Sequence, residues 1–343
     1  MSRKNTDRNR FDEEKKLYFS QGTEPFCGTP EHPETYIYRM KQSGVHVREH
    51  VIDTGRGGDA VEIVQITDVH FNAFDEIDEQ NEELMLTKVG RQWLRNAESV
   101  AGIQRAMEYA HFADQTVITG DTLDFLSHAA MALTQKYIWD VDPDALITLG
   151  GHDVTRSMQS VQPDQTSLAS RQKILEDFWK HDIYYESRLV GDKALVVALD
   201  NGCGCYWDVQ VPKLKADIER ARQNGYAVLI FQHEPISTGR PEDEELPAIR
   251  VYDPKTWDSS RAIGSPKRQS SEATGEVVRL IKENADVVRG IYCGHQHSAF
   301  YCEVLASYPG ADGRKRDAVI PQYILEGNPY DGQCGHVLKI TVK

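Results

Sequence analysis

The chain has 343 residues, of which 40% are hydrophobic and 27% charged, and its formal net charge is -14. This composition is typical of a globular protein, and the lack of a long apolar run argues against a membrane-spanning chain. The acidic balance argues against anionic lipid and nucleic acid as partners without excluding the latter, because both attract basic surfaces.

The first part of the chain differs from the rest. Residues 1–44 are polar and rich in turn formers, without sustained periodicity, which predicts an N-terminal extension before one domain over 45–343. The opening residues lack the apolar core of a secretory signal, so a cytoplasmic protein is expected. The six cysteines are scattered, with only Cys203 and Cys205 close together, which favours reduced thiols over a disulfide framework.

Apolar alternation begins at Val45. The runs 45–53 and 60–67 flank a turn-like glycine-rich stretch, which predicts a β-hairpin. Further short β-rich runs are QTVIT, ALITL, ALVVAL, YAVLIF, VVRGIYC, QYILEG and HVLKITV. Segments with helical spacing separate them: WLRNAESVAGIQRAMEYA, LKADIERARQ and GEVVRLIKEN. Strands mixed with helices predict an α/β layered fold.

Two polar segments interrupt this pattern. Residues 75–83 are acidic and predict the start of a solvated helix. Residues 237–275 are polar and contain Pro and Gly, so a lid, a binding loop and a partly disordered loop stay open. Arginines of that loop (Arg240, Arg250 and Arg261) have the right geometry for a phosphate but are more often solvated.

Histidine and aspartate residues follow five of the predicted strands at their carboxyl ends. They occur in the short sequences Asp68-Val-His70, Gly120-Asp121, Gly150-Gly-His-Asp153, His233 and Gly294-His-Gln-His297. Loops beyond the carboxyl ends of strands in layered α/β sheets gather in one crevice. We therefore expect these segments to meet.

A mixture of imidazole and carboxylate suits zinc, iron or manganese better than magnesium or calcium. Asp121 is the natural candidate to bridge two ions. Two cations about 3.5–4 Å apart activate a hydroxide and hold phosphoryl oxygens during in-line attack. The pattern therefore predicts a site for two divalent or trivalent metal ions and phosphoester hydrolysis.

The ordered motifs D-x-H, G-D-x-x-D, G-N-H-D/E, H and G-H-x-H resemble those of the calcineurin-like metallophosphoesterase superfamily. The match runs from Asp68 to His297. The resemblance implies two packed mixed β-sheets flanked by helices, a four-layer αββα sandwich. It also implies a hydrolase that cleaves phosphomonoesters or phosphodiesters by attack of a metal-bound hydroxide.

The resemblance assigns roles to individual residues. Metal ligation is implied for Asp68, His70, Asp121, His233, His295 and His297. Asp68, His70 and His297 would hold the first ion, Asp121 would bridge, and the other two histidines would hold the second. His152 would act as general acid or phosphate-binding group, with Asp153 orienting it, while Asp124 would support the site through hydrogen bonds.

Gly151 departs from the family pattern, because an asparagine that normally binds the second ion stands at this place in the motif. The second ion then keeps three protein ligands and an open position, which is a workable catalytic arrangement. Alternatively, the second site is weak or empty and the chain is a catalytically weak or silent metal- or phosphate-binding module. An introduced substitution is a third interpretation.

The expected substrate is a phosphorylated small molecule or protein, and its identity stays open. Asn201 and Gly202, which follow a predicted strand, resemble a short turn of some phosphodiesterase-type members of the superfamily. This turn is a weak signal of substrate class.

Overall fold

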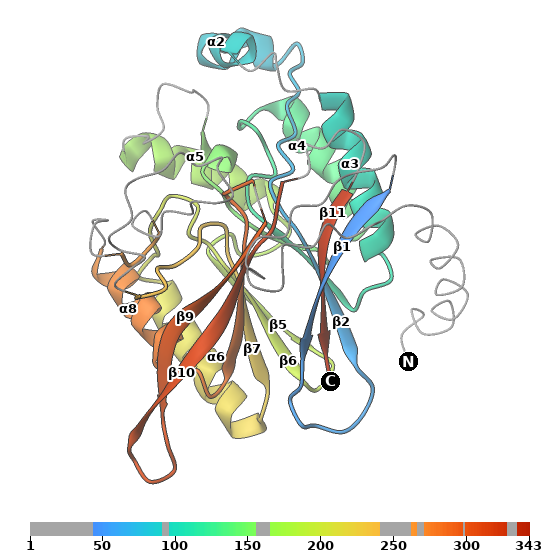
Figure 1. Cartoon of the computed structure of the whole chain (residues 1–343). Helices are drawn as coiled ribbons and strands as arrows, with labels where there is room; N and C mark the ends of the chain where they lie inside the picture. Colours follow the sequence, from blue (N-terminus) through green and yellow to red (C-terminus); the bar gives the residue numbers. More distant parts are fainter. Residues whose placement is uncertain are drawn as a thin grey trace.

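The computed structural model describes residues 44–90, 96–155, 165–240, 262–265, 271–297, 299–327 and 335–343. Its strands form two mixed sheets (Figure 1). The first sheet has the order β1 (Val45–Ile52), β11 (Gly335–Val342), β2 (Val61–Ile66), β3 (Gln115–Thr119) and β4 (Leu146–Thr148). The second has the order β5 (Tyr185–Val190), β6 (Ala194–Leu199), β7 (Ala227–Phe231), β8 (Val288–Cys293), β10 (Lys315–Ile324) and β9 (Phe300–Pro309).

Helices cover the outer faces of both sheets. The α-helices are α2 (Glu82–Gly90), α3 (Asn96–Ala110), α4 (His128–Thr134), α5 (Gln165–Phe178), α6 (Gln210–Asn224) and α8 (Glu272–Lys282). Shorter turns are η2 (Asp78–Gln80), the π-helical η3 (Gln135–Trp139) and η4 (His152–Val154). Figure 1 shows α3 and α4 beside the first sheet and α6 and α8 beside the second. The predicted fold class, two packed mixed sheets flanked by helices, is confirmed.

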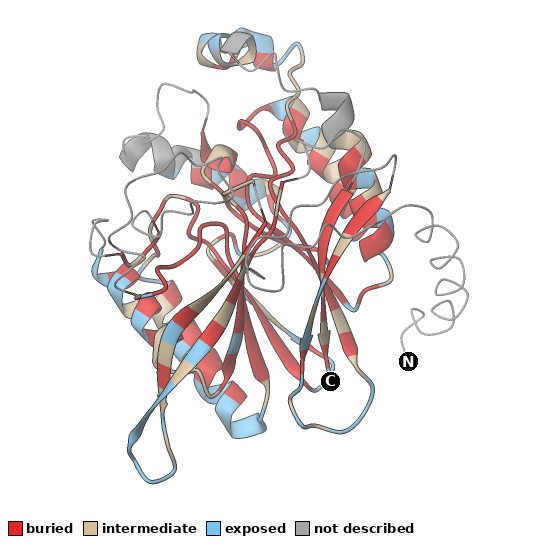
Figure 2. Ribbon diagram, in the orientation of Figure 1, coloured by how far each residue is buried: buried red, intermediate tan, exposed pale blue. Residues whose placement is uncertain are grey.

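The side chains of a central strand face two different cores. In β6, Val197 packs with Leu214 of α6, while its neighbour Val196 packs with Ile63 across the interface between the sheets. Successive side chains of a strand point to opposite faces, so a strand covered on both sides is apolar throughout. Every residue of β6 is buried (Figure 2). This burial explains why ALVVAL reads as a continuous apolar run.

The predicted hairpin between residues 45–53 and 60–67 is wrong. β11 lies between β1 and β2, parallel to β1 and antiparallel to β2. Alternation identifies a strand but not its partner, because any strand with a matching apolar face satisfies the pattern. β11 is mostly buried and takes the inner place, whereas β1 carries Arg48, Glu49 and His50 and forms the edge.

Other elements differ from the sequence prediction at their bounds. β5 and β9 were not among the predicted strands. α8 begins at Glu272 with Ser271 as its N-cap, inside the predicted loop 237–275.

Within the described residues no helix is both long and apolar enough to cross a membrane. Residues 1–43 and 241–261 lie outside the described ranges, so the predicted extension and most of the loop stay predictions.

Candidate metal centre

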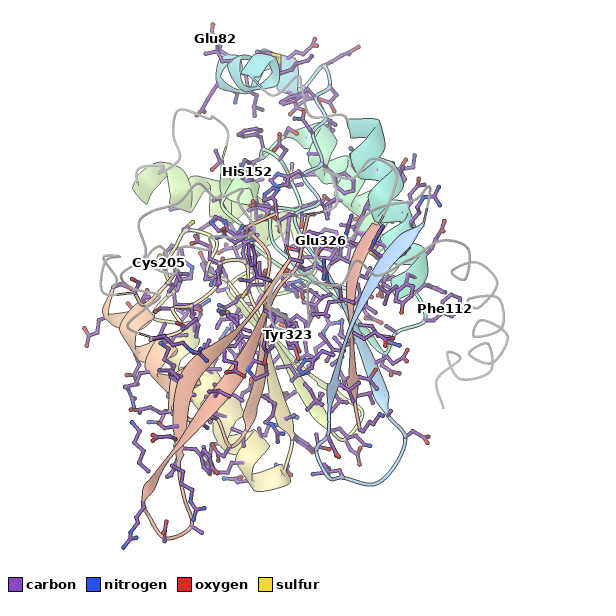
Figure 3. The ribbon with its side chains drawn as sticks, in the orientation of Figure 1. Glu82, Phe112, His152, Cys205, Tyr323 and Glu326 are labelled. Atoms are coloured by element: carbon purple, nitrogen blue, oxygen red, sulfur yellow. The ribbon has the colours of Figure 1, made fainter. Side chains whose placement is uncertain are left out.

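The five predicted segments meet at one end of the two sheets. Backbone hydrogen bonds join Asp68 N to Gly120 O and His70 N to Asp121 O, so the loops after β2 and β3 run side by side. Another joins Gly294 N to His233 O, which links the loops after β7 and β8. Figure 3 shows His152 above the strands, among these loops.

Backbone strain is concentrated in this cluster. Throughout the described ranges, the non-glycine residues with positive φ are Asp68, His70, Asp121, His295 and His297, with φ between 47° and 72°. All belong to the six predicted ligands. A left-handed conformation costs a residue with a β-carbon about 1–2 kcal/mol, and such strain persists where the surrounding structure enforces it. The fold therefore holds these side chains in place at an energetic cost, which is typical of functional sites.

Four of the predicted ligands surround a common point. The atoms Asp68 Oδ1, His70 Nε2, Asp121 Oδ2 and His297 Nε2 come from a group whose ligand atoms lie within 4.8 Å of one another. His297 Nε2 lies 3.1 Å from Asp68 Oδ1, and His70 Nε2 lies 3.3 Å from His297 Nε2 and 3.6 Å from Asp121 Oδ2. Ligands at about 2.0–2.2 Å from a tetrahedral ion are about 3.3–3.6 Å apart. The donors therefore fit a single transition-metal ion.

Asp121 also faces a second pair of imidazoles. Its Oδ2 lies 3.3 Å from His233 Nε2, which in turn lies 3.3 Å from His295 Nδ1. The same oxygen thus lies near both His70 Nε2 and His233 Nε2, as expected of a bridging carboxylate. In the described part of the chain, His233 and His295 belong to neither of the compact groups of potential ligands. The second position is therefore the more open of the two.

Hydrogen bonds fix which nitrogen of each ring faces inward. His70 Nδ1 lies 3.0 Å from Asp124 Oδ1, and His233 Nδ1 donates to Thr119 O at 2.9 Å. Both rings therefore present Nε2 to the centre, as metal-binding histidines usually do. The supporting hydrogen bond expected of Asp124 is present.

Asp153 binds backbone amides instead of the His152 ring that it was expected to orient. His152 Nδ1 donates to the backbone oxygen of Asp124 at 2.8 Å, so Asp124 orients this ring. The carboxylate oxygens of Asp153 instead accept from Leu123 N and Gly150 N, both at 2.7 Å. Asp153 therefore ties the loop after β3 to the loop after β4. The order of the motifs does not show which side chain orients the His152 ring and which one ties the two loops together, because His152 and Asp153 follow the same strand.

Two motif glycines leave room for ligand carboxylates. A β-carbon on Gly150 would lie 2.1 Å from Asp121 Oδ1, and one on Gly294 would lie 2.2 Å from Asp68 Oδ2. Both distances are far inside van der Waals contact. Gly151 is different, because its φ of -61° suits any residue and its nearest neighbour would be Gly202 O at 3.2 Å. The φ of Gly151 therefore does not require glycine, but a β-carbon would meet Gly202 O inside ordinary van der Waals contact.

The pKa values of two histidines and one aspartate at the site are raised. Burial alone would lower the pKa of His70, but its contacts with Asp124 and Asp68 raise it to about 10. Burial also opposes protonation of His233, yet the charge of Asp121 raises its pKa to about 10. Burial, followed by the charge of Asp121, raises the pKa of Asp153 to about 7. A dense group of buried carboxylates thus attracts positive charge, from protons or from metal ions.

The raised pKa values of His70 and His233 predict that metal binding releases protons. His70 and His233 are protonated at pH 7 in the metal-free protein and must lose their protons to bind an ion, so about two protons should be released. Since both pKa values lie near 10, the apparent affinity should rise with pH up to that value. Calorimetric titration with Mn²⁺ in buffers of different ionisation enthalpy measures the number, and a heat independent of the buffer contradicts the prediction.

The same shifts set how the metal-free protein responds to pH. A histidine whose pKa is raised on folding stabilises the fold below its unfolded value near 6.5, and this contribution disappears as the pH rises through about 10. The melting temperature after chelation should therefore fall over that interval. The metal-loaded protein lacks these protons and should not share this contribution.

Comparison with known proteins gives distant structural likenesses. No family model matches the sequence, and no curated protein is significantly similar to it. Solved structures that are similar include a dimetal phosphatase from Danio rerio, with a TM-score of 0.45 and 14% identity over 78% of this chain and 88% of that chain. A purple acid phosphatase from yellow lupin (Lupinus luteus) gives 0.45 and 10% over 80% and 45%. A putative 5'-nucleotidase from Staphylococcus aureus gives 0.36 and 12% over 78% and 54%.

Sequence reasoning missed two supporting residues and gave little weight to a third. Thr67 Oγ1 donates to Asp68 Oδ2 at 2.7 Å, and Asn72 Nδ2 donates to Asp124 Oδ2 at 2.7 Å. Both flank the D-x-H motif, which is the signal that would have indicated them. Asn201 supports the segment of His233, as described below. In the loop, Arg240 pairs with Glu303 at 2.9 Å, while Arg250 and Arg261 lie outside the described residues.

Proposed function

We propose that this chain is a calcineurin-like metallophosphoesterase, a hydrolase that uses two metal ions to cleave phosphoester bonds. The observation that carries the proposal is the convergence of the six predicted ligands, with Asp121 Oδ2 near both His70 and His233 and five of the six in a strained backbone conformation. Independent roles as caps or core residues would not place them together in this way. Manganese, iron and zinc suit the donor set.

Each group of residues has a distinct role in the proposal. Asp68, His70 and His297 would hold one ion, His233 and His295 the other, and Asp121 both. Ions bound there would supply Lewis acidity, an activated water and charge neutralisation at phosphorus. Asp124 fixes the rings of His70 and His152.

His152 is proposed to act on the leaving group. Its Nδ1 is engaged by the Asp124 carbonyl, which leaves Nε2 for the substrate. The side chain is 35% exposed, unlike the buried ligands beside it. Burial lowers its pKa, so its protonated form is a stronger acid but a smaller fraction of the protein at neutral pH.

The direct test is activity with defined metals. Purified protein would be stripped with a chelator, reloaded with Mn²⁺, Fe²⁺ or Zn²⁺, and assayed with p-nitrophenyl phosphate and bis(p-nitrophenyl) phosphate. Hydrolysis that needs added metal is expected, and the ratio of the two rates separates monoesterase from diesterase. Inactivity with every metal and both esters would contradict the hydrolase proposal.

A second candidate function is a metal- or phosphate-binding module without turnover. The observation that favours it is Gly151, which leaves the second position with Asp121, His233 and His295 as its proposed protein ligands. His233 and His295 also fall outside the compact ligand groups of the described chain. Metal content distinguishes the candidates only together with turnover, since a module of this kind binds metal as well.

Gly151→Asn is expected to strengthen the second site. The φ of Gly151 suits a residue with a side chain, and a β-carbon there needs Gly202 O, 3.2 Å away, to shift by a few tenths of an ångström. The asparagine amide would then add an oxygen donor to the loop after β4. We expect roughly ten- to a hundredfold tighter binding of the second ion, with higher activity at limiting metal. Mn²⁺ titration followed by assay measures both quantities.

Gly151→Ala is the matched control for that variant, because it adds the β-carbon without the amide. It should bind the second ion as wild type does. Equal metal affinities in Gly151→Asn and wild type would mean that the missing asparagine is not what limits the site.

The partners proposed are a phosphorylated small molecule or protein, with neither membrane nor nucleic acid as the main substrate. A cytoplasmic location is proposed as well. The scattered spacing of the six cysteines supports a reducing compartment.

A further inference from the structure

The segment that carries His233 leaves β7 and crosses the site as an irregular chain. Asn201, fully buried in the turn after β6, is bound to this segment at three backbone atoms. Its Oδ1 accepts from His233 N at 3.0 Å and from Glu234 N at 2.9 Å, and its Nδ2 donates to Glu234 O at 2.8 Å. One amide side chain thus serves as the backbone partner of two successive residues.

A second buried amide holds the same segment farther along. Gln322 of β10 accepts from Ile236 N at 2.9 Å and donates to Ile236 O at 3.0 Å. The two amides are alike in burial and in the kind of hydrogen bond they make. They differ in position, because only Asn201 binds the backbone of a proposed ligand.

The far side of the His233 ring is restrained by the bond from its Nδ1 to Thr119 O. Two points therefore define where Nε2 lies: the backbone, held by Asn201, and the ring, held by Thr119. The turn of Asn201 also touches the loop with the missing ligand. A β-carbon on Gly202 would lie 2.6 Å from Gly150 Cα, and one on Gly151 would lie 3.2 Å from Gly202 O.

We propose that Asn201 is a positioning residue for the second metal ion, acting through His233. The inference rests on the proposed function. The second position has fewer protein ligands than the first, so its affinity depends more strongly on each of them. Loosening His233 should therefore weaken the second ion and leave the first, held by Asp68, His70, His297 and Asp121, unchanged.

The test compares Asn201→Ala with Gln322→Ala. Each variant removes one buried amide side chain that holds the same segment. Mn²⁺ binding would be followed by electron paramagnetic resonance titration, with metal content after dialysis and thermal melting alongside. Asn201→Ala is expected to weaken the second ion about ten- to a hundredfold, the range typical of groups that orient ligands, with the first ion unchanged. Gln322→Ala is expected to lower the melting temperature while both ions bind as in wild type.

A milder variant covers the case in which Asn201→Ala does not fold. Asn201→Ser keeps a hydroxyl acceptor but is too short to serve all three backbone atoms, so it should show the same selective loss to a smaller degree. The inference is overturned if the Asn201 variants bind both ions normally, or if the Asn201 and Gln322 variants weaken the second ion equally. A wild-type protein that binds a single ion overturns the dinuclear proposal itself, and this inference with it.

Discussion

Asp121→Asn is expected to abolish phosphoester hydrolysis, with kcat/KM lower by on the order of a thousandfold or more. Asp121 Oδ2 faces His70 Nε2 at 3.6 Å and His233 Nε2 at 3.3 Å, so it is the one oxygen placed for both ions. An amide has the same shape but no charge, and it loses a bridging ligand worth several kcal/mol in the transition state. Steady-state kinetics and metal analysis of the dialysed protein measure the two consequences.

A matched control for this variant is Asp142→Asn. Asp142 is also buried, but its carboxylate accepts from Thr116 Oγ1 at 2.7 Å, on β3 and away from the ligand cluster. Its replacement should affect stability and leave metal content and kcat/KM near wild type. If Asp121→Asn retained two ions and more than about a tenth of the activity, the bridging role would be wrong.

His152→Asn is expected to lower kcat about a hundredfold or more for esters with poor leaving groups, the range typical of general acid catalysis. The asparagine amide can replace the bond to the Asp124 carbonyl but carries no dissociable proton for the leaving oxygen. Esters of p-nitrophenol need little protonation, so their hydrolysis should fall much less. Rates across alkyl and aryl phosphate esters measure this dependence on leaving group.

A uniform loss across all esters would contradict the acid role and indicate binding or structural support instead. Metal content gives a second check, because His152 lies with His70 and Asp124 in a compact group of potential ligands. In the proposed function His152 binds no ion. Loss of an ion from His152→Asn would therefore reassign it as a ligand.

That the candidate residues would lie together was easier to predict from sequence than how the strands that carry them pair. Each proposed ligand directly follows a buried apolar run, and the end of a strand fixes the position of the next few residues closely. The cluster of Asp68, His70, Asp121 and His297 is thus a consequence of strand ends that meet. Strand pairing depends on contacts far apart in the chain, so the place of β11 between β1 and β2 left no local signal.

The supporting residues show a similar limit. Asn201 lies in a turn whose sequence suggested only a substrate class, and its role depends on where β7 ends in space. Asp153 was expected to orient His152. Whether its carboxylate binds that ring or the nearby backbone amides depends on the local geometry of the loops. A polar side chain next to a motif predicts that it will form hydrogen bonds, but not with which partner.

The position of β11 also governs the order in which the chain can fold during its synthesis. β1 and β2 are made before the other described strands, yet the strand that joins them, β11, is made after them all. Until β11 emerges, the facing edges of β1 and β2 expose unpaired backbone groups, which are a risk for aggregation. Contacts between such distant parts of a chain also slow folding. Asp68 follows β2, so the candidate metal centre depends on a strand that is made long after the segment that carries Asp68.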